Sequence, residues 1–181
     1  PPPADNLLSR LTYNDMTGYS AELFERLDTP INVFVKGNIG LGGLPTGEMN
    51  DEDWNIGGPI GYSNTTSHEC NGRMAYATAD VGYDFLTGDS YKAGLFVGYN
   101  YFNERIDSRG CIQNASPAAG CSPPFPDFFL VGTETAYWNS LRVGLATETR
   151  LFDRFKLKTD IAYLPYAEMG GSRDNHLLRT S

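Results

Sequence analysis

The segment Met74–Leu86, with the sequence MAYATADVGYDFL, decides the fold class of this chain. Its residues alternate between two sets, and an alternation of period two places successive side chains on opposite faces of a β-strand. The turn-forming residues 87–90, TGDS, follow directly, so the sequence predicts a tight hairpin here. One face would carry Ala75, Ala77, Ala79, Val81, Tyr83 and Phe85, and the other Tyr76, Thr78, Asp80, Gly82 and Asp84.

The same period recurs along most of the chain, and no segment shows the period of a helix. Short turns are predicted at 28–30, 87–90 and 152–154, and long loops at 55–73 and 107–133, where Gly, Pro, Ser and Asn gather. The sequence therefore predicts an all-β, antiparallel fold. The other predicted strands are 9–23, 31–43, 91–106, 136–151 and 155–166.

Two features favour a membrane barrel over other all-β folds. The predicted strands run to about 13–16 residues, whereas strands in soluble sheets usually have ~5–6. Short turns alternate with long loops, as they do in outer-membrane barrels, and the polar faces carry charged residues and glycine, which suits a water-filled interior. We therefore expect a transmembrane antiparallel β-barrel of the outer-membrane type. The alternative is a soluble barrel or sandwich with one wet face.

Composition narrows the function classes. The chain has 181 residues, enough for one domain, and 14 Lys and Arg against 22 Asp and Glu give a net charge of −8. This balance argues against non-specific binding of nucleic acid, which needs positive charge. We expect residues 1–8 to be a flexible leader and residues 9–181 to be the barrel domain. Its external loops are predicted at about 44–73, 107–135 and 168–181.

Cysteine is sparse. Cys111 and Cys121 flank a segment that looks like an exposed loop, and a disulfide closing that loop would suit an oxidising compartment. The alternative is two free thiols. Cys70 has no obvious partner, and no Cys and His spacing indicates a zinc site, so no metal is expected.

Acidic residues at two places suggest a catalytic site. Asp51 and Asp53 are two residues apart in an extended segment, so they would share one face, with Cα atoms roughly 6.5–7 Å apart. Asp174 and His176 have the same spacing near the end of the chain. Both pairs follow a strand that leaves a short turn, so both belong at the same external rim. Together they could activate water; the alternative is a solvated acidic rim.

At these residues the sequence resembles the omptin family of outer-membrane proteases. The resemblance rests on the segments Met49-Asn50-Asp51-Glu52-Asp53-Trp54, Ser67-His68 and Asp174-Asn175-His176, and more weakly on a hairpin over Leu86–Gly110. It implies a barrel of about ten strands, part of them present here.

The resemblance also implies a role for each acidic residue. Asp174 would orient His176, and His176 would deprotonate the attacking water. Asp51 and Asp53 would hold that water and share a proton, because two close carboxylates resist double ionisation. The implied activity is peptide cleavage at the cell surface without a cofactor.

Some positions depart from the family's pattern. Its preference for basic substrate residues depends on acidic groups, and Asn64 and Ser172 stand at two of those places. With His68, they are the predicted substrate-binding residues. The family holds lipopolysaccharide through an outward basic cluster, and Asn103 and Tyr137 occupy such places here, so lipopolysaccharide stays an open expectation.

The resemblance places the chain in the outer membrane of a Gram-negative bacterium. Its expected partners are membrane lipid, a peptide or protein substrate, and other membrane proteins. Six or seven strands are too few for the implied barrel, and an open barrel would leave strand edges unpaired in lipid. We therefore expect further strands of a longer protein, or other chains, to complete it. The alternative functions are an inactive structural or interaction barrel and a small-solute pore.

Overall fold

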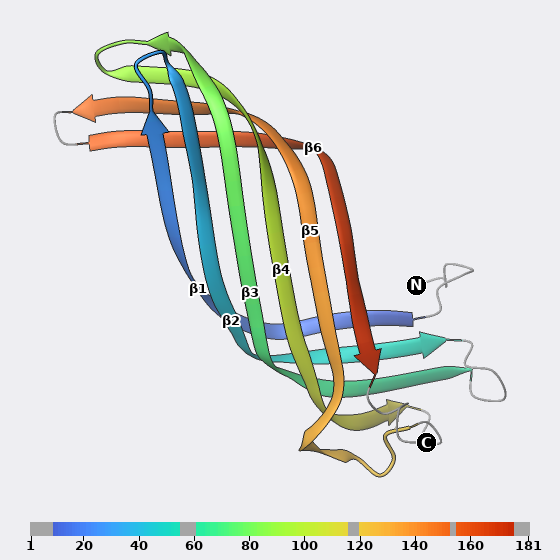
Figure 1. Cartoon of the computed structure of the whole chain (residues 1–181). Coiled ribbons are helices and arrows are strands. Elements are labelled where there is room, and N and C mark those ends of the chain that lie inside the picture. The colour runs from blue at the N-terminus through green and yellow to red at the C-terminus, as the bar shows by residue number, and fades with distance from the viewer. Residues whose placement is uncertain (1–8, 55–60, 116–119, 153–154, 176–181) are drawn as a thin grey trace.

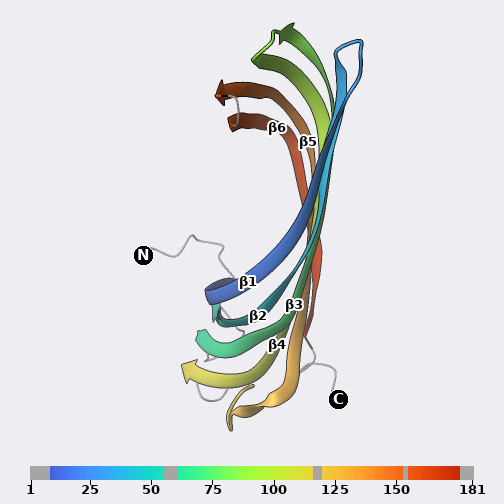
Figure 2. The ribbon, with the colours of Figure 1, turned by 90° about the vertical axis from the view of Figure 1, so that its left-hand side faces the viewer.

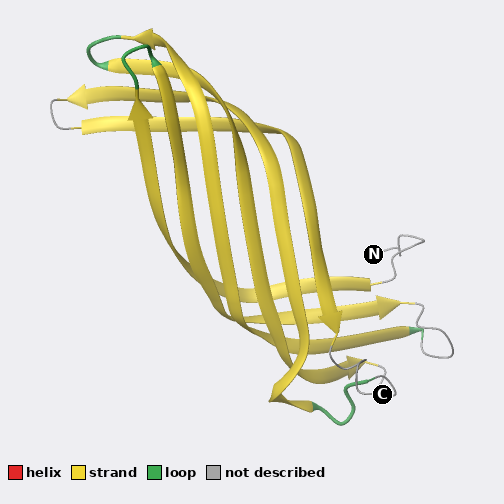
Figure 3. Ribbon diagram, viewed as in Figure 1, coloured by secondary structure: helices red, strands yellow, loops and turns green. Residues whose placement is uncertain are grey.

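A computed structural model describes residues 9–54, 61–115, 120–152 and 155–175. The described part is strand and connecting turn, and it contains no helix that is long and apolar enough to cross a membrane (Figure 3). Its six strands form one antiparallel sheet in the order of the sequence (Figure 1). The strands are β1 (Ser9–Asp28), β2 (Val33–Trp54), β3 (Tyr62–Thr87), β4 (Tyr91–Ala115), β5 (Phe125–Phe152) and β6 (Phe155–Asn175).

The prediction of an all-β, antiparallel fold is confirmed. The hairpin that the sequence predicts at 87–90 joins β3 to β4, with Thr87 opposite Lys92. The sheet is open: within the described residues β1 pairs only with β2, and β6 only with β5. Closure into a barrel and insertion into a membrane therefore remain predictions.

The strands are longer than predicted, and much of the chain that was predicted as long loops is strand. Residues 44–54 and 62–73 are strand, as are 107–115, 125–135 and 168–175. Polar side chains that suggest a loop in the sequence hydrogen-bond across the ladder instead: Asn50 Nδ2 donates to Asn64 Oδ1 at 3.0 Å. A strand ladder needs backbone partners rather than apolar residues, so it continues where the hydrophobic alternation stops.

The first turn lies slightly later than predicted. The Thr29 amide donates to the Val33 carbonyl at 2.9 Å, and the Asn32 amide donates to the Thr29 carbonyl at 3.2 Å. Asn32 has φ = 62°, a left-handed conformation that asparagine tolerates better than most residues. The turn therefore occupies 29–32, and β2 begins at Val33 instead of Ile31.

The sheet is strongly curled. Lys36 Nζ on β2 lies 2.6 Å from Asp160 Oδ1 on β6, although three strands separate them. In a flat sheet these two strands would lie about 19 Å apart, too far for the two side chains to meet. Figure 2 shows the curvature from the side. We call the face that carries Lys36 the inner face and the opposite one the outer face.

The half of the sheet next to the short turns has two contrasting faces. On its inner face Phe34, Phe96 and Ala146 form a buried cluster, and Arg26 Nη2 lies 2.8 Å from Asp84 Oδ2. Its outer face exposes apolar side chains on all six strands, which we call the apolar band. They are Leu23, Leu27, Val35, Ile39, Leu41, Val81, Tyr83, Phe85, Leu95, Val97, Tyr99, Leu141, Val143, Leu157, Ile161 and Tyr163.

We call the half of the sheet that carries the apolar band the band half, and the remainder of the sheet the rim half. The rim half comprises residues 9–19, 43–54, 62–73, 104–115, 125–135 and 170–175. Cys111 of this half is joined by a disulfide to Cys121 in the connection before β5, with Cα atoms 5.7 Å apart, which is the pairing that the sequence favours. Both cysteines are buried with Val131, and Phe125 packs against them. Cys70 is a free thiol.

Candidate functional site

Asp51 and Asp53 lie on the inner face of β2 in the rim half. The register pairs them with Thr65 and Ser63 of β3, so the two carboxylates share a face as their spacing predicts. Both side chains are partly buried. The arrangement places two acidic groups next to each other in partial shelter from water.

Arg173 of β6 reaches across the inner face to this pair. Its Nη2 lies 3.0 Å from Asp51 Oδ2, and Ser9 Oγ donates to Asp51 Oδ1 at 3.4 Å. Burial raises the pKa of Asp51 above its ordinary range, Asp53 raises it further, and the positive charge of Arg173 partly offsets both effects. The end of β6 therefore meets the acidic segment of β2, but through Arg173, which the sequence did not single out.

Asp174 points to the other face. Its cross-strand partner on β5 is Thr133, whose Oγ1 donates to Asp107 Oδ1 at 3.1 Å. Because neighbouring residues of a strand project to opposite faces, Arg173 and Asp174 cannot both face Asp51. The expected meeting of Asp174 with the Asp51 and Asp53 pair is therefore not found.

His176 lies outside the described residues, so its pairing with Asp174 remains a prediction. Within the described part of the chain, no three His, Cys, Asp or Glu side chains are grouped so that they could hold a metal ion.

The predicted substrate-binding residues also lie on the outer face. The register pairs Asp51 with Thr65, so Asn64 and His68, at the opposite phase of β3, project away from Asp51. Ser172 shares the phase of Asp174 on β6. These three residues therefore do not share a face with Asp51, and their role in substrate binding stays a prediction.

The inner face of the rim half carries further polar groups that the sequence analysis missed. The Tyr13 hydroxyl of β1 donates to the Glu134 carboxylate of β5, again across the curl of the sheet. Ser108 Oγ donates to Glu69 Oε1 at 2.5 Å, and only 1% of Glu69 is exposed. Burial raises the pKa of Glu69, and its Oε2 has no hydrogen-bond partner among the described residues. Alternation alone would put Glu69 and Asp80 on opposite faces of β3; both face inward because the register of this strand shifts between Cys70 and Arg73. The sequence also does not show which strands the curl brings together.

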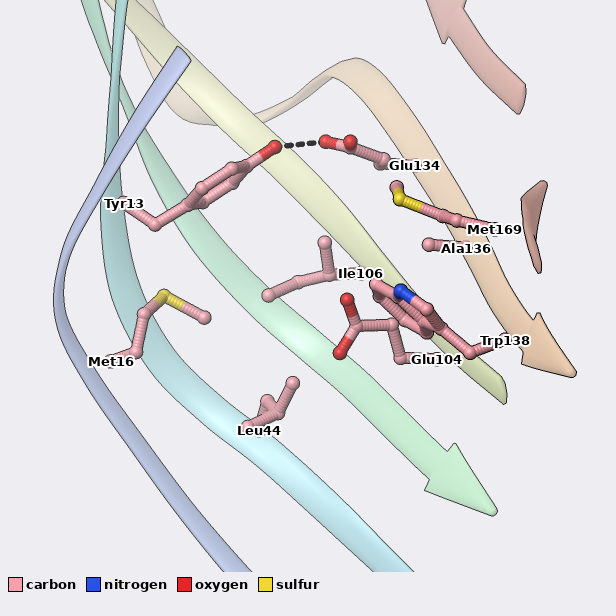
Figure 4. A pocket seen from close by; sticks show the side chains of 9 residues that line it. All are labelled: Tyr13, Met16, Leu44, Glu104, Ile106, Glu134, Ala136, Trp138 and Met169. Atoms are coloured by element: carbon pink, nitrogen blue, oxygen red, sulfur yellow. Dashed lines mark hydrogen bonds between the residues drawn. The ribbon is translucent and has the colours of Figure 1, made fainter. Parts of the chain in front are cut away.

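A pocket of about 430 Å³ lies beside these groups (Figure 4). Its walls are mostly apolar and come from five of the six strands, and two glutamates stand among them. The lining residues are Tyr13, Met16, Leu44, Glu104, Ile106, Glu134, Ala136, Trp138 and Met169.

No family model and no curated protein matches the sequence of this chain. The inner face of the rim half offers two candidate sites. One is the pair of Asp51 and Asp53, and the other is the pocket with its two glutamates.

Proposed function

We propose that this chain forms part of the wall of a transmembrane β-barrel in the outer membrane of a Gram-negative bacterium. The observation that supports this proposal is the contrast between the two faces of the band half. The outer face exposes apolar side chains on every strand, while the inner face holds ion pairs such as Lys36 with Asp160. An exposed apolar surface of this extent is costly in water and favourable in lipid.

The height of the apolar band agrees with a bilayer. On β3 the outward positions from Ala75 to Phe85 span about 11 residues, and a tilted transmembrane strand needs about 9–11. The rim half lies beyond this band, so Asp51 and the pocket would stand outside the hydrocarbon layer.

The open edges set a further condition. In lipid, every backbone N–H and C=O must find a partner within the protein, and one edge each of β1 and β6 has none among the described strands. We therefore propose that additional strands, of the same protein or of other membrane proteins, complete the wall.

Quenching by brominated lipid tests the orientation of the sheet. Trp54 and Trp138 are first replaced by phenylalanine, and a single tryptophan is then introduced by Leu95→Trp or by Phe96→Trp. These neighbours lie on opposite faces: Leu95 is 60% exposed and Phe96 is 4% exposed. In bilayers with brominated acyl chains, we expect strong quenching for Leu95→Trp and weak quenching for Phe96→Trp.

Equal, weak quenching of both variants, in protein whose circular dichroism shows folded β-structure, would contradict the proposal. It would favour the soluble sheet with one wet face. The two variants are a matched pair because they differ by one residue along the same strand.

An endopeptidase active at the rim is the second candidate function. It is favoured by the Asp51 and Asp53 pair, because a carboxyl with a raised pKa can hold a proton and act as a general acid. Arg173, 3.0 Å from Asp51, would supply positive charge beside a developing oxyanion. His176 is retained as the proposed base on the strength of the omptin resemblance.

Cleavage of a peptide library by the protein refolded in detergent, with and without lipopolysaccharide, tests this second function. We expect Asp51→Asn and His176→Ala to abolish cleavage and Asp127→Asn, an exposed acid on β5, to leave it unchanged. Absence of cleavage by the folded wild type would leave a structural or interaction barrel. Ion conductance in its place would indicate a pore.

A further inference from the structure

Glu104 stands apart from the other acids of the inner face. It lines the 430 Å³ pocket, and no hydrogen bond or ion pair holds its carboxylate among the described residues. Glu134, the second acid of the pocket, accepts the Tyr13 hydroxyl. Within the pocket, Glu104 is therefore the carboxylate left without a partner.

The surroundings of Glu104 make a charged carboxylate costly. Burial raises its pKa, and the negative charge of Glu134 raises it further. Leu44, Ile106 and Trp138 provide apolar surface in the same pocket. A carboxylate among apolar groups is stabilised when a cation binds to it, because the cation offsets the lost hydration.

We propose that this pocket binds an amphipathic amine, a ligand with an ammonium group attached to an apolar body. The ammonium would pair with Glu104, and the apolar body would lie on Leu44 and Ile106. The face of Trp138 would add a cation–π or hydrophobic contact, depending on where the ammonium lies. This site uses none of the residues that the peptidase proposal needs, so it does not depend on catalysis.

The local charge excludes the opposite ligand class. Glu69, Glu104 and Glu134 all lie on this part of the inner face, and Arg173 is already 3.0 Å from Asp51. An anionic amphiphile of the same shape would meet net repulsion. A neutral one would fill the apolar walls but leave Glu104 uncompensated. The pocket should therefore prefer an amine to an alcohol, and an alcohol to a carboxylate.

A titration with three six-carbon ligands tests this order. Hexylammonium, hexanol and hexanoate are added to the protein in detergent with Trp54→Phe, so that Trp138 is the reporter, and micelles without protein supply the blank. We expect saturable binding of hexylammonium at least tenfold tighter than that of hexanol, and no binding of hexanoate.

Glu104→Gln should remove this preference. We expect the substitution to lower the affinity for hexylammonium at least tenfold and to leave the affinity for hexanol unchanged. Unchanged hexanol binding also shows that the pocket is intact. Asp89→Asn, at an exposed position of the turn between β3 and β4, is the control and should bind all three ligands like the wild type.

Any of three results would overturn the proposal. The first is that hexanol binds as tightly as hexylammonium, and the second is that Glu104→Gln binds hexylammonium with full affinity. The third is a fluorescence change no larger than that of micelles without protein.

Discussion

The two halves of the inner face differ in how their carboxylates are paired with cations. In the band half each of three carboxylates meets a cation: Asp84 lies 2.8 Å from Arg26, and Asp80 and Asp160 lie 3.6 and 2.6 Å from Lys36. In the rim half Glu69 and Glu104 have no ion pair within the described part of the chain. The same curled sheet thus pairs its charges in one half and leaves carboxylates uncompensated in the other.

This difference separates structure from function. The pair of Lys36 with Asp160 joins β2 to β6 and so holds the curl of the sheet in place. A carboxylate that is partly buried without a cation, such as that of Glu104, is costly for the fold, so packing alone does not account for it. We therefore propose the rim half as the part of this chain that binds a ligand or substrate.

Breaking the pairing in the band half should have the largest effect. Lys36→Met keeps the length of the side chain but leaves Asp80 and Asp160 without this cation. The side chain of Lys36 is 2% exposed, and removing one partner of a buried pair costs about 3–5 kcal/mol. We expect a loss of this size in the free energy of unfolding, measured by urea titration of the protein in detergent micelles.

Lys158→Met is the matched control. Its ammonium lies 3.7 Å from Glu148, but its side chain is 53% exposed, so the pair contributes at most about 1 kcal/mol. Equal losses of unfolding free energy in the two variants would show that Lys36 does not stabilise the curled sheet more than an exposed ion pair does.

The band half was also the part of the fold that the sequence could predict. There the outer face is apolar and the inner face polar, so period two is plain in segments such as Met74–Leu86. In the rim half polar residues stand on both faces, and the Ser, Thr and Asn residues of 63–67 look like a loop. Their strand structure comes from the ladder to β2 and β4, where Gln113 Nε2 donates to Ser63 Oγ at 2.9 Å.

The candidate site was predictable to a similar, limited degree. Spacing within one strand correctly put Asp51 and Asp53 on one face. The face of Asp174 depends on the phase of β6 against β5, which no local pattern fixes. The approach of Arg173 to Asp51 depends on the curl of the whole sheet, so the sequence offered no signal for it.

Removing an uncompensated acid should stabilise the rim half. Glu69→Gln keeps the shape and the hydrogen bond from Ser108 while removing a charge that is 1% exposed. An unpaired charge costs more to bury than the neutral amide that replaces it, so we expect a gain of about 1–3 kcal/mol at pH 7 in the same urea titration.

The pH dependence identifies the cause of that gain. The folded-state pKa of Glu69 is raised, so the folded protein binds its proton more tightly than the unfolded chain. The wild type should lose stability as pH rises above the ordinary glutamate pKa of about 4.3, and the gain from Glu69→Gln should vanish below it. A gain that is the same at pH 4 and pH 7 would point to packing instead of charge.

The contact between Asp51 and Arg173 should have the smallest effect on stability of the three, because water reaches both side chains. Its side chains are 18% and 31% exposed, so a double-mutant cycle with Asp51→Asn and Arg173→Gln should give a coupling of about 1 kcal/mol. The coupling should shrink as salt is added, since water reaches the pair. A coupling near 3 kcal/mol that salt leaves unchanged would make this pair a structural brace like Lys36. The weak coupling that we expect would leave Arg173 able to move from Asp51 to a bound ligand, which a residue at a working site must be able to do.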